Sequence, residues 1–153
     1  MQPHLRKCFD NINRIKFTEE EESREVVEMV SAEPENMPEL VKFSESVIIT
    51  PDDKVENWLM RIQNMMVDSL RDLSVKSYIE FPVGQVQTRK SWIFDNYPAQ
   101  SILLVEMVYW QQLVTEAVLS IPNNSNSLPE CFTFWQKIMT DMVNIVCLDL
   151  NLL

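Results

Sequence analysis

The sequence predicts a mainly α-helical protein with a small β-hairpin or a few short strands over residues 25–49. Three observations support this fold class. Glycine, which tight hairpins and phosphate-binding loops need most, occurs once in 153 residues, at Gly84. Several long segments repeat apolar residues every three or four positions, the period of a helix with a buried face. Prolines and β-branched residues gather in residues 25–49, where they exclude a continuous helix.

The first elements are a helix over residues 4–16 and the short strands over residues 25–49. Apolar residues keep the helical spacing directly after Pro3. They are Leu5, Cys8, Phe9, Ile12 and Ile15. Four consecutive glutamates, residues 19–22, repel one another and predict a solvated turn. Two or three strands then follow, interrupted by Pro34 and Pro38.

A helix over residues 51–73 comes next. Thr50 offers a capping hydroxyl, Pro51 suits the first helical position, and the carboxylates of residues 52 and 53 suit the helix dipole. Apolar side chains then keep the 3.6-residue period for about five turns. They are Val55, Trp58, Leu59, Ile62, Met65, Met66, Leu70 and Leu73. Methionines can line an adaptable groove, but this single stripe favours a buried core face with Trp58 as its central anchor.

The second half of the chain contains a connection over residues 80–98, a helix over residues 99–121 and a helix over residues 129–150. Pro82, Gly84 and Pro98 punctuate the connection. The helix 99–121 is apolar over more than half of its circumference, so we expect it to be covered on more than one side. The last helix ends without a glycine or a basic final turn, so we expect the structural unit to continue past it.

Composition and charge narrow the class of protein. Hydrophobic residues at 46% and charged residues at 24% are typical of a soluble globular domain, and we expect a single domain over residues 1–153. The net charge is −10, and it belongs to residues 18–56, which hold thirteen acidic and three basic side chains. An acidic region argues against nucleic acid and against an anionic membrane surface as partners.

A membrane anchor is not expected either. Residues 96–115 come closest to a span, with Glu106 as their only charge. Glu106, Gln111 and Gln112 nevertheless fall in mid-segment, and the apolar runs are far shorter than the roughly 20 residues that a bilayer requires. We expect a buried helix there. The amino terminus has no apolar core of a signal peptide.

The sequence presents no catalytic, cofactor-binding or metal-binding residues. One glycine cannot form a P-loop or a dinucleotide-binding loop. The single histidine, His4, is expected to be solvated, and Cys8, Cys131 and Cys147 lack metal-ligand spacing. These cysteines lie among apolar residues, where a free thiol of a reducing compartment acts as a small hydrophobe. The glutamates of residues 19–22 and 25 lack the spacing and the central glycine of a calcium loop.

Three stretches, taken in order, resemble the linker region of dynein heavy chains. They are QPHLRKCFDNI (residues 2–12), VENWLMRIQNMMVDSLRDL (residues 55–73) and, after Trp92, YPAQSILLVEMVYWQQLVTEAV (residues 97–118). The resemblance covers residues 2 to about 120, more loosely the rest, and is closer to the axonemal than to the cytoplasmic branch. One departure is clear. The family usually has a Ser-x-Glu-Gly-Glu turn where this chain has Ser31-Ala32-Glu33-Pro34-Glu35, so the family's hairpin geometry and register cannot be carried over.

The resemblance implies a non-catalytic segment of a rod-like helical linker. In dyneins this linker lies across a ring of AAA+ modules and transmits force in an ATP-driven, minus-end-directed microtubule motor, here one of ciliary beating. ATP and Mg²⁺ would bind in the ring of the parent and not in this chain. The implied partners are the ring, the remaining linker and, indirectly, intermediate chains, light chains and microtubules. The implied location is the cytoskeleton of the cytoplasm, in the axoneme of a cilium.

Two other functions stay open. A free-standing helical interaction module, or a truncated dynein-like product, could bind a partner through its acidic region or its apolar carboxyl end. An enzyme without a recognisable signature is the third reading, and His4 with the three cysteines would supply its base and nucleophile.

Overall fold

The computed structural model describes residues 5–19, 24–32, 38–82 and 86–150. The described chain is mainly helical, with a three-stranded antiparallel sheet, which confirms the predicted fold class at this level. The chain divides into two compact units, Met1–Val75 and Lys76–Leu153. The expected single domain over residues 1–153 stays a prediction, and each unit is described by itself.

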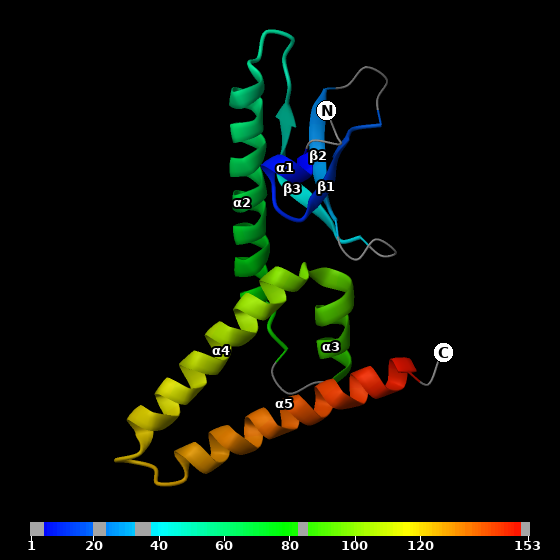
Figure 1. Cartoon of the computed structure of the whole chain (residues 1–153). Helices are drawn as coiled ribbons and strands as arrows, with labels where there is room; N and C mark the ends of the chain where they lie inside the picture. Colours follow the sequence, from blue (N-terminus) through cyan, green and yellow to red (C-terminus); the bar gives the residue numbers. More distant parts are fainter. Residues whose placement is uncertain (1–4, 20–23, 33–37, 83–85, 151–153) are drawn as a thin grey trace. The chain divides into compact units, whose positions relative to one another are not determined.

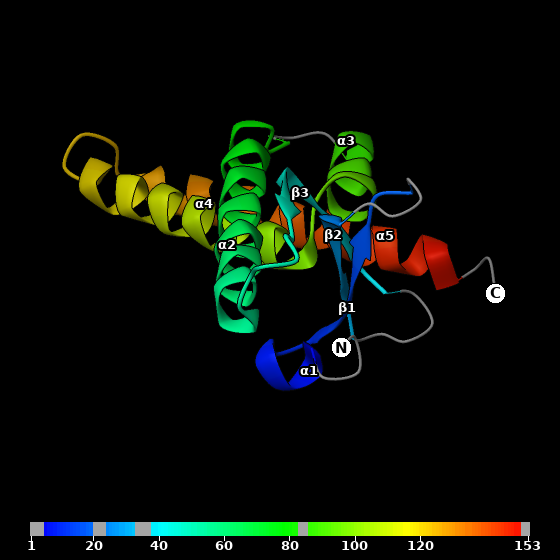
Figure 2. The ribbon, with the colours of Figure 1, turned by 90° about the horizontal axis from the view of Figure 1, so that it is seen from above.

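Unit 1 combines the sheet with one long helix (Figure 1). A single turn of helix, α1 (Leu5–Cys8), precedes β1 (Ile12–Phe17). The strands β2 (Glu25–Ser31) and β3 (Leu40–Ile48) follow, and the sheet order is β1-β2-β3. The helix α2 (Val55–Ile79) closes the unit, except that its last turn, from Lys76, is assigned to unit 2. In both views α2 lies alongside β3 (Figures 1 and 2).

The predicted helix 4–16 is wrong beyond its first turn. Asn11 adopts a left-handed backbone with φ 60°, a conformation that asparagine tolerates and that ends a helix. Ile12–Phe17 then pairs with β2, with Ile15 opposite Met29. Residues 12 and 15 have the spacing of a helix face, and a regular strand would place them on opposite faces. The register shift between Ile12 and Arg14 allows both to pack against the core, and the apolar period did not reveal that shift.

The predicted strands over residues 25–49 are confirmed as β2 and β3. Val30 pairs with Leu40 and Met29 with Val41, but the register shifts between Val26 and Glu28, where several β3 residues oppose one β2 residue. This irregularity bends the strand pair. The turn in which proline replaces the family's glycine lies at residues 33–37, outside the described residues.

The helix α2 begins four residues later and ends six residues later than predicted. Asp53 explains the late start, because its Oδ2 accepts hydrogen bonds from the Thr50 backbone N–H at 2.7 Å and from Arg61 Nη2 at 2.6 Å. Residues 50–53 therefore form a turn, and the helix starts at Val55. The pKa of Asp53 is lowered to about 2 by the hydrogen bond from Arg61 and by that from the Thr50 backbone.

The core of unit 1 lies between the sheet and α2. Trp58 is 4% exposed and Ile62 is fully buried, so the predicted internal wall, with Trp58 at its centre, is confirmed. Met66 is buried and Met65 is half-buried. The remaining buried residues of this cluster are Leu5, Ile15, Val26, Met29, Val41 and Val47.

Polar contacts fix the position of β3 against α2. The Ser44 backbone N–H donates to Ser69 Oγ at 2.9 Å, and Ser44 Oγ donates to Asp72 Oδ2 at 3.0 Å. Ser69 is completely buried, so its hydroxyl satisfies a strand N–H inside the helix–sheet interface.

Unit 2 consists of α3 (Val86–Ser91), the π-helical turn η2 (Trp92–Asn96), α4 (Ala99–Ser120) and α5 (Ser127–Leu150). The helices predicted over residues 99–121 and 129–150 are confirmed, whereas the predicted connection 80–98 contains α3 and η2. In Figure 1, α4 and α5 diverge from the loop that joins them. Across that loop, Ser127 Oγ at the start of α5 donates to the carbonyl oxygen of Ala117 on α4 at 2.7 Å and joins the two helices where they diverge.

An aromatic cluster occupies the interior of unit 2. The rings of Phe81 and Tyr109 stack with centroids 3.9 Å apart, and Trp92 meets Phe81 edge-on at 5.3 Å. The Trp92 indole N–H donates to the Ser77 carbonyl at 3.2 Å. Tyr97 donates to Glu80, and burial, followed by the negative charge of Glu80, raises the pKa of the Tyr97 phenol.

The expectation that α4 is covered on more than one side is wrong for this chain. Its buried residues are few: Ser101, Ile102, Val105 and Ala117. Met107 is 70% exposed and Leu119 is 72% exposed. Among the helices of the described ranges, α4 has the length and apolar composition to cross a membrane, and 17% of its most apolar stretch is buried. The expected absence of a membrane anchor therefore stays a prediction.

Candidate functional site

The residues considered for chemistry do not form a site in the described structure. His4 and Glu20–Glu22 lie outside the described residues. The three cysteines are free thiols, with Cys8 and Cys147 exposed and Cys131 half-buried. The interpretation of Cys8 and Cys147 as small core hydrophobes is therefore wrong. In the described ranges, histidine, cysteine and carboxylate side chains do not gather in threes as a metal site would require.

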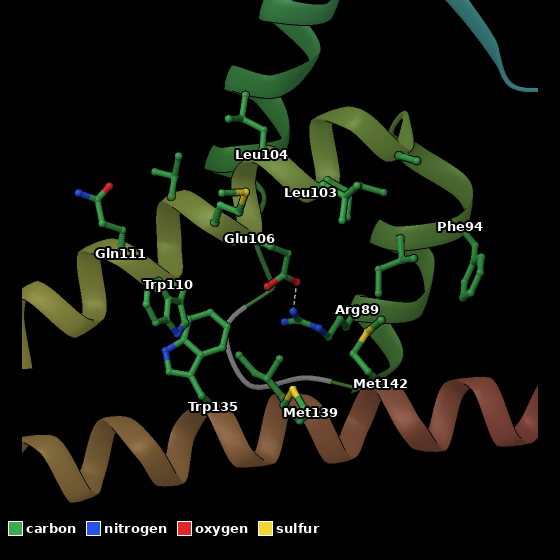
Figure 3. A pocket seen from close by; sticks show the side chains of 16 residues that line it. Arg89, Phe94, Leu103, Leu104, Glu106, Trp110, Gln111, Trp135, Met139 and Met142 are labelled. Atoms are coloured by element: carbon green, nitrogen blue, oxygen red, sulfur yellow. Dashed lines mark hydrogen bonds and ion pairs between the residues drawn. The ribbon is translucent and has the colours of Figure 1, made fainter. Parts of the chain in front are cut away.

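The structure has a groove of about 1030 Å³ in unit 2. Figure 3 shows its walls, which come from α3 and η2, from α4 and from α5. Its lining is almost entirely apolar and includes two tryptophans and three methionines. The lining residues are Arg89, Ile93, Phe94, Ala99, Ile102, Leu103, Leu104, Glu106, Met107, Val108, Trp110, Gln111, Trp135, Ile138, Met139 and Met142.

One buried ion pair lies within this groove. Arg89, on α3, is 2% exposed and pairs with Glu106, on α4 (Figure 3). Burial raises the pKa of the Glu106 carboxyl, and the positive charge of Arg89 opposes that rise. Desolvation thus outweighs the attraction, as is usual for buried pairs. The pair fixes α3 to α4 by geometry more than by net energy.

Two nitrogen donors in the groove walls have no partner. Arg89 Nε and Trp135 Nε1 are buried and make no hydrogen bond among the described residues. A buried donor without an acceptor costs about 1–3 kcal/mol. Each such atom therefore calls for an acceptor that would complete the site.

Sequence reasoning missed this groove. It considered a methionine-lined groove only on residues 55–73, where the methionines proved to be core or outward-facing residues of α2. The groove methionines are Met107, Met139 and Met142, which come from two helices separated by a loop. The available signal was the excess apolar width of residues 99–121, which the sequence analysis attributed to covering neighbours.

The groove offers binding chemistry and no visible reaction chemistry. Its ionisable side chains are Arg89 and Glu106, and they neutralise each other. A general base must be free to accept a proton from a substrate within hydrogen-bond distance. Glu106 instead accepts the hydrogen bond of Arg89. The arrangement can exclude water, hold apolar groups and donate hydrogen bonds.

Comparison with known proteins gives a consistent result. Residues 1–77 match the family model described as "Dynein heavy chain, N-terminal region 2". The chain is 35% identical over 146 residues to dynein axonemal heavy chain 1 of Mus musculus, which covers 95% of this chain and 3% of that protein. It is 31% identical over 121 residues to dynein axonemal heavy chain 3 of Homo sapiens, covering 77% of this chain and 3% of that protein.

A third relative covers the same share of the chain as the mouse protein. Dynein axonemal heavy chain 12 of Rattus norvegicus is 29% identical over 148 residues, covering 95% of this chain and 4% of that protein. The chain therefore spans only a few per cent of the length of these relatives. The family model alone covers half of the chain, and its last residue, 77, falls two residues after the end of unit 1. The chain belongs to the dynein heavy chain family, in its N-terminal region 2.

Proposed function

We propose that this chain is a non-catalytic, force-transmitting linker segment of a dynein heavy chain. The observation that carries the proposal is the match of residues 1–77 to the dynein N-terminal region, continued by axonemal relatives over 95% of the chain. The motor of which it would form part is ATP-driven and minus-end-directed on microtubules, and it would act in ciliary beating.

The build of unit 1 supports a mechanical role. Its helix α2 runs without interruption over 25 residues and is held against the sheet by an apolar core and by buried Ser69. A helix of that length spans about 37 Å. Such an element transmits displacement along its axis, because packed interiors resist deformation. A rod-like linker built from helices of this kind is the arrangement that we propose.

The chemistry of the motor would lie elsewhere in the parent. One glycine in 153 residues leaves too few for a phosphate-binding loop, so ATP and Mg²⁺ would bind in the AAA+ ring. The partners would be that ring and the remaining linker, with intermediate chains, light chains and microtubules indirectly. The location would be the axoneme of a cilium, within the cytoskeleton.

Microtubule gliding by the parent motor tests this function. We expect Trp58→Ala, which removes the centre of the unit 1 core, to slow gliding while microtubule-stimulated ATP hydrolysis persists. The matched control is Met60→Ala, two residues away on the exposed face of α2 at 61% exposure. Normal gliding by the Trp58 variant, or a parallel loss of hydrolysis and gliding, would contradict a role in force transmission.

A free-standing interaction module is the second candidate, favoured by the exposed apolar side chains of α4 and α5. The purified 153-residue chain distinguishes the two. A monomer that unfolds cooperatively indicates a self-sufficient module. A chain that aggregates, or that loses its near-ultraviolet circular dichroism while keeping its helices, indicates that neighbouring segments complete it.

A further inference from the structure

We propose that the unit 2 groove is the docking site of an amphipathic α-helix from another part of the same heavy chain, and that this helix supplies acceptors for Trp135 and Arg89. The inference rests on the proposed function, because it takes the occupant from the parent polypeptide. Beyond the proposed function, it names the binding surface, a helical occupant and the polar contact that would make binding specific.

The dimensions of the groove fit a helix. One wall runs along α4 from Ala99 to Gln111 and another along α5 from Trp135 to Met142. At 1.5 Å per residue these walls are about 18 Å and about 10 Å long, or roughly two to three helical turns. A groove between two helices is a common receptor for the apolar face of a third helix.

The lining also fits a helix in its chemistry. Met107 is 70% exposed and Met139 is 67% exposed, on opposite walls, and flexible thioethers adapt to the side chains of a docked helix. Trp110 and Trp135 lie between those walls (Figure 3) and offer the large flat surfaces that dominate binding energy. An occupant must therefore present an apolar stripe.

The two unpartnered donors restrict the occupant further. Trp135 Nε1 and Arg89 Nε are buried in the groove walls without an acceptor. A purely apolar occupant would leave them without an acceptor, so the cost of about 1–3 kcal/mol for each donor would remain. A helix that carries a glutamine, asparagine or carboxylate within its apolar stripe would satisfy them, so we expect such a residue at the position that meets Trp135.

The same polypeptide is the preferred source of the helix. The groove carries no net charge, because Arg89 and Glu106 neutralise each other, so a separate partner would find no charge to steer its association. A segment tethered in the same chain does not need that attraction, since its effective concentration is high. The relatives supply such segments, because this chain spans only 3% of dynein axonemal heavy chain 1.

Peptide binding to the purified 153-residue chain tests the inference. The probes are fluorescent peptides, each about 25 residues or seven helical turns long, that tile the region following the matched segment in the mouse relative. We expect one peptide to bind, and to gain helical circular dichroism on binding. Met107→Lys should weaken that binding at least about tenfold, because it places a charge in an apolar contact.

Leu119→Lys is the matched control. Leu119 lies on the same helix, is 72% exposed and does not line the groove, so its replacement should leave binding unchanged. Trp135→Phe keeps an aromatic ring and removes the donor, and we expect it to weaken binding about threefold to tenfold. If Trp135→Phe binds as tightly as the wild type, the proposed acceptor contact is wrong.

Three other outcomes would overturn the docking site itself. They are a folded chain that binds none of the peptides, a peptide whose affinity is equal in the Met107 and Leu119 variants, and self-association of the chain that Met107→Lys abolishes. These results are separable from the gliding assay. Peptide binding with normal gliding by the Trp58 variant would contradict force transmission alone, whereas slowed gliding without peptide binding would contradict the docking site alone.

Discussion

The interiors of the two units contain different kinds of interaction. Unit 1 places apolar side chains from all its strands and from α2 in one cluster, with Trp58 and Ile62 almost without exposure. Unit 2 holds an aromatic stack and a buried ion pair, while its two long helices leave large apolar side chains in solvent. The apolar residues of unit 1 that form this cluster are thus buried by other residues of the same unit. In unit 2, the apolar faces of α4 and α5 are larger than the described residues can cover.

The largest expected effect tests the self-sufficiency of unit 1. Trp58→Ala should lower the free energy of unfolding by about 3–5 kcal/mol, because it removes a buried aromatic side chain and leaves a cavity between α2 and the sheet. Chemical unfolding followed by circular dichroism measures the change.

The exposed neighbour on the same helix supplies the control for that measurement. Met60→Ala should change the free energy of unfolding by no more than about 0.5 kcal/mol. A loss below about 1 kcal/mol for Trp58→Ala would place that tryptophan at a surface and would remove the contrast between the units.

The next effect concerns the interior of unit 2. Glu106→Gln should lower the free energy of unfolding by about 2–3 kcal/mol, because it leaves the guanidinium of Arg89 buried without a counter-ion. Glu106 keeps 24% of its side chain exposed, which places the expectation below the full range for buried pairs. Thermal unfolding with probes on the unit 2 aromatic residues reports the loss.

A double replacement distinguishes the net stability contributed by the Arg89–Glu106 pair from the cost of leaving one of its charges unpaired. Arg89→Met together with Glu106→Leu should recover most of the loss, because an apolar pair of similar volume is often as stable as a buried ion pair. If the double variant is as unstable as the single one, the ion pair contributes net stability to unit 2. Both units would then have interiors that stabilise the fold.

A smaller effect tests the polar contact within the core of unit 1. Ser69→Ala should cost about 1 kcal/mol, because the Ser44 backbone N–H loses its acceptor in the helix–sheet interface. Gln63→Ala, on the exposed side of the same helix, should stay within about 0.5 kcal/mol. Denaturant midpoints at equal slope compare the two variants. Equal midpoints would show that the interface depends on apolar contact alone.

The smallest effect is a pH dependence at the surface of unit 1. The pKa of Asp53 is about 2 in the folded chain and near 3.9 in unfolded peptides. Its stabilising contribution is therefore complete above about pH 4 and is lost as the pH falls toward 2. Asp53→Asn should flatten the slope of denaturant midpoint against pH in that window. An unchanged slope would mean that Arg61 and Thr50 do not hold the carboxylate in solution.

Much of the fold could be predicted because long helices repeat their signal. Three helices were predicted from the spacing of their apolar residues, and the strands between Glu25 and Ile48 were predicted from their β-branched residues and prolines. Short elements failed. β1 directs Ile12 and Ile15 inward at a helical spacing, which its register shift between Ile12 and Arg14 makes possible. Asp53 formed a turn where a helix start was expected, because its carboxylate binds Thr50 and Arg61.

The candidate site could not be predicted from the sequence. Arg89 lies in a segment that reads as a polar connection, and its partner Glu106 read as an obstacle to a membrane span. Their pairing depends on how α3 and η2 return toward α4, which no local pattern contains. The exposed methionines of α4 and α5 looked like core residues, because periodicity shows that a helix has an apolar face without showing what covers it.

The hydrogen bond between Ser44 and Ser69 opposes sliding of β3 along the axis of α2. Apolar contact is non-directional, so by itself it does not single out one position of β3 during a slip along the helix axis. A hydrogen bond between a strand N–H and a helix hydroxyl lengthens at once in such a slip and weakens steeply with angle. If α2 carries load as proposed, the hydrogen bonds from Ser44 to Ser69 and to Asp72 and from Arg61 to the Ile48 carbonyl would be the first contacts to lengthen in that slip.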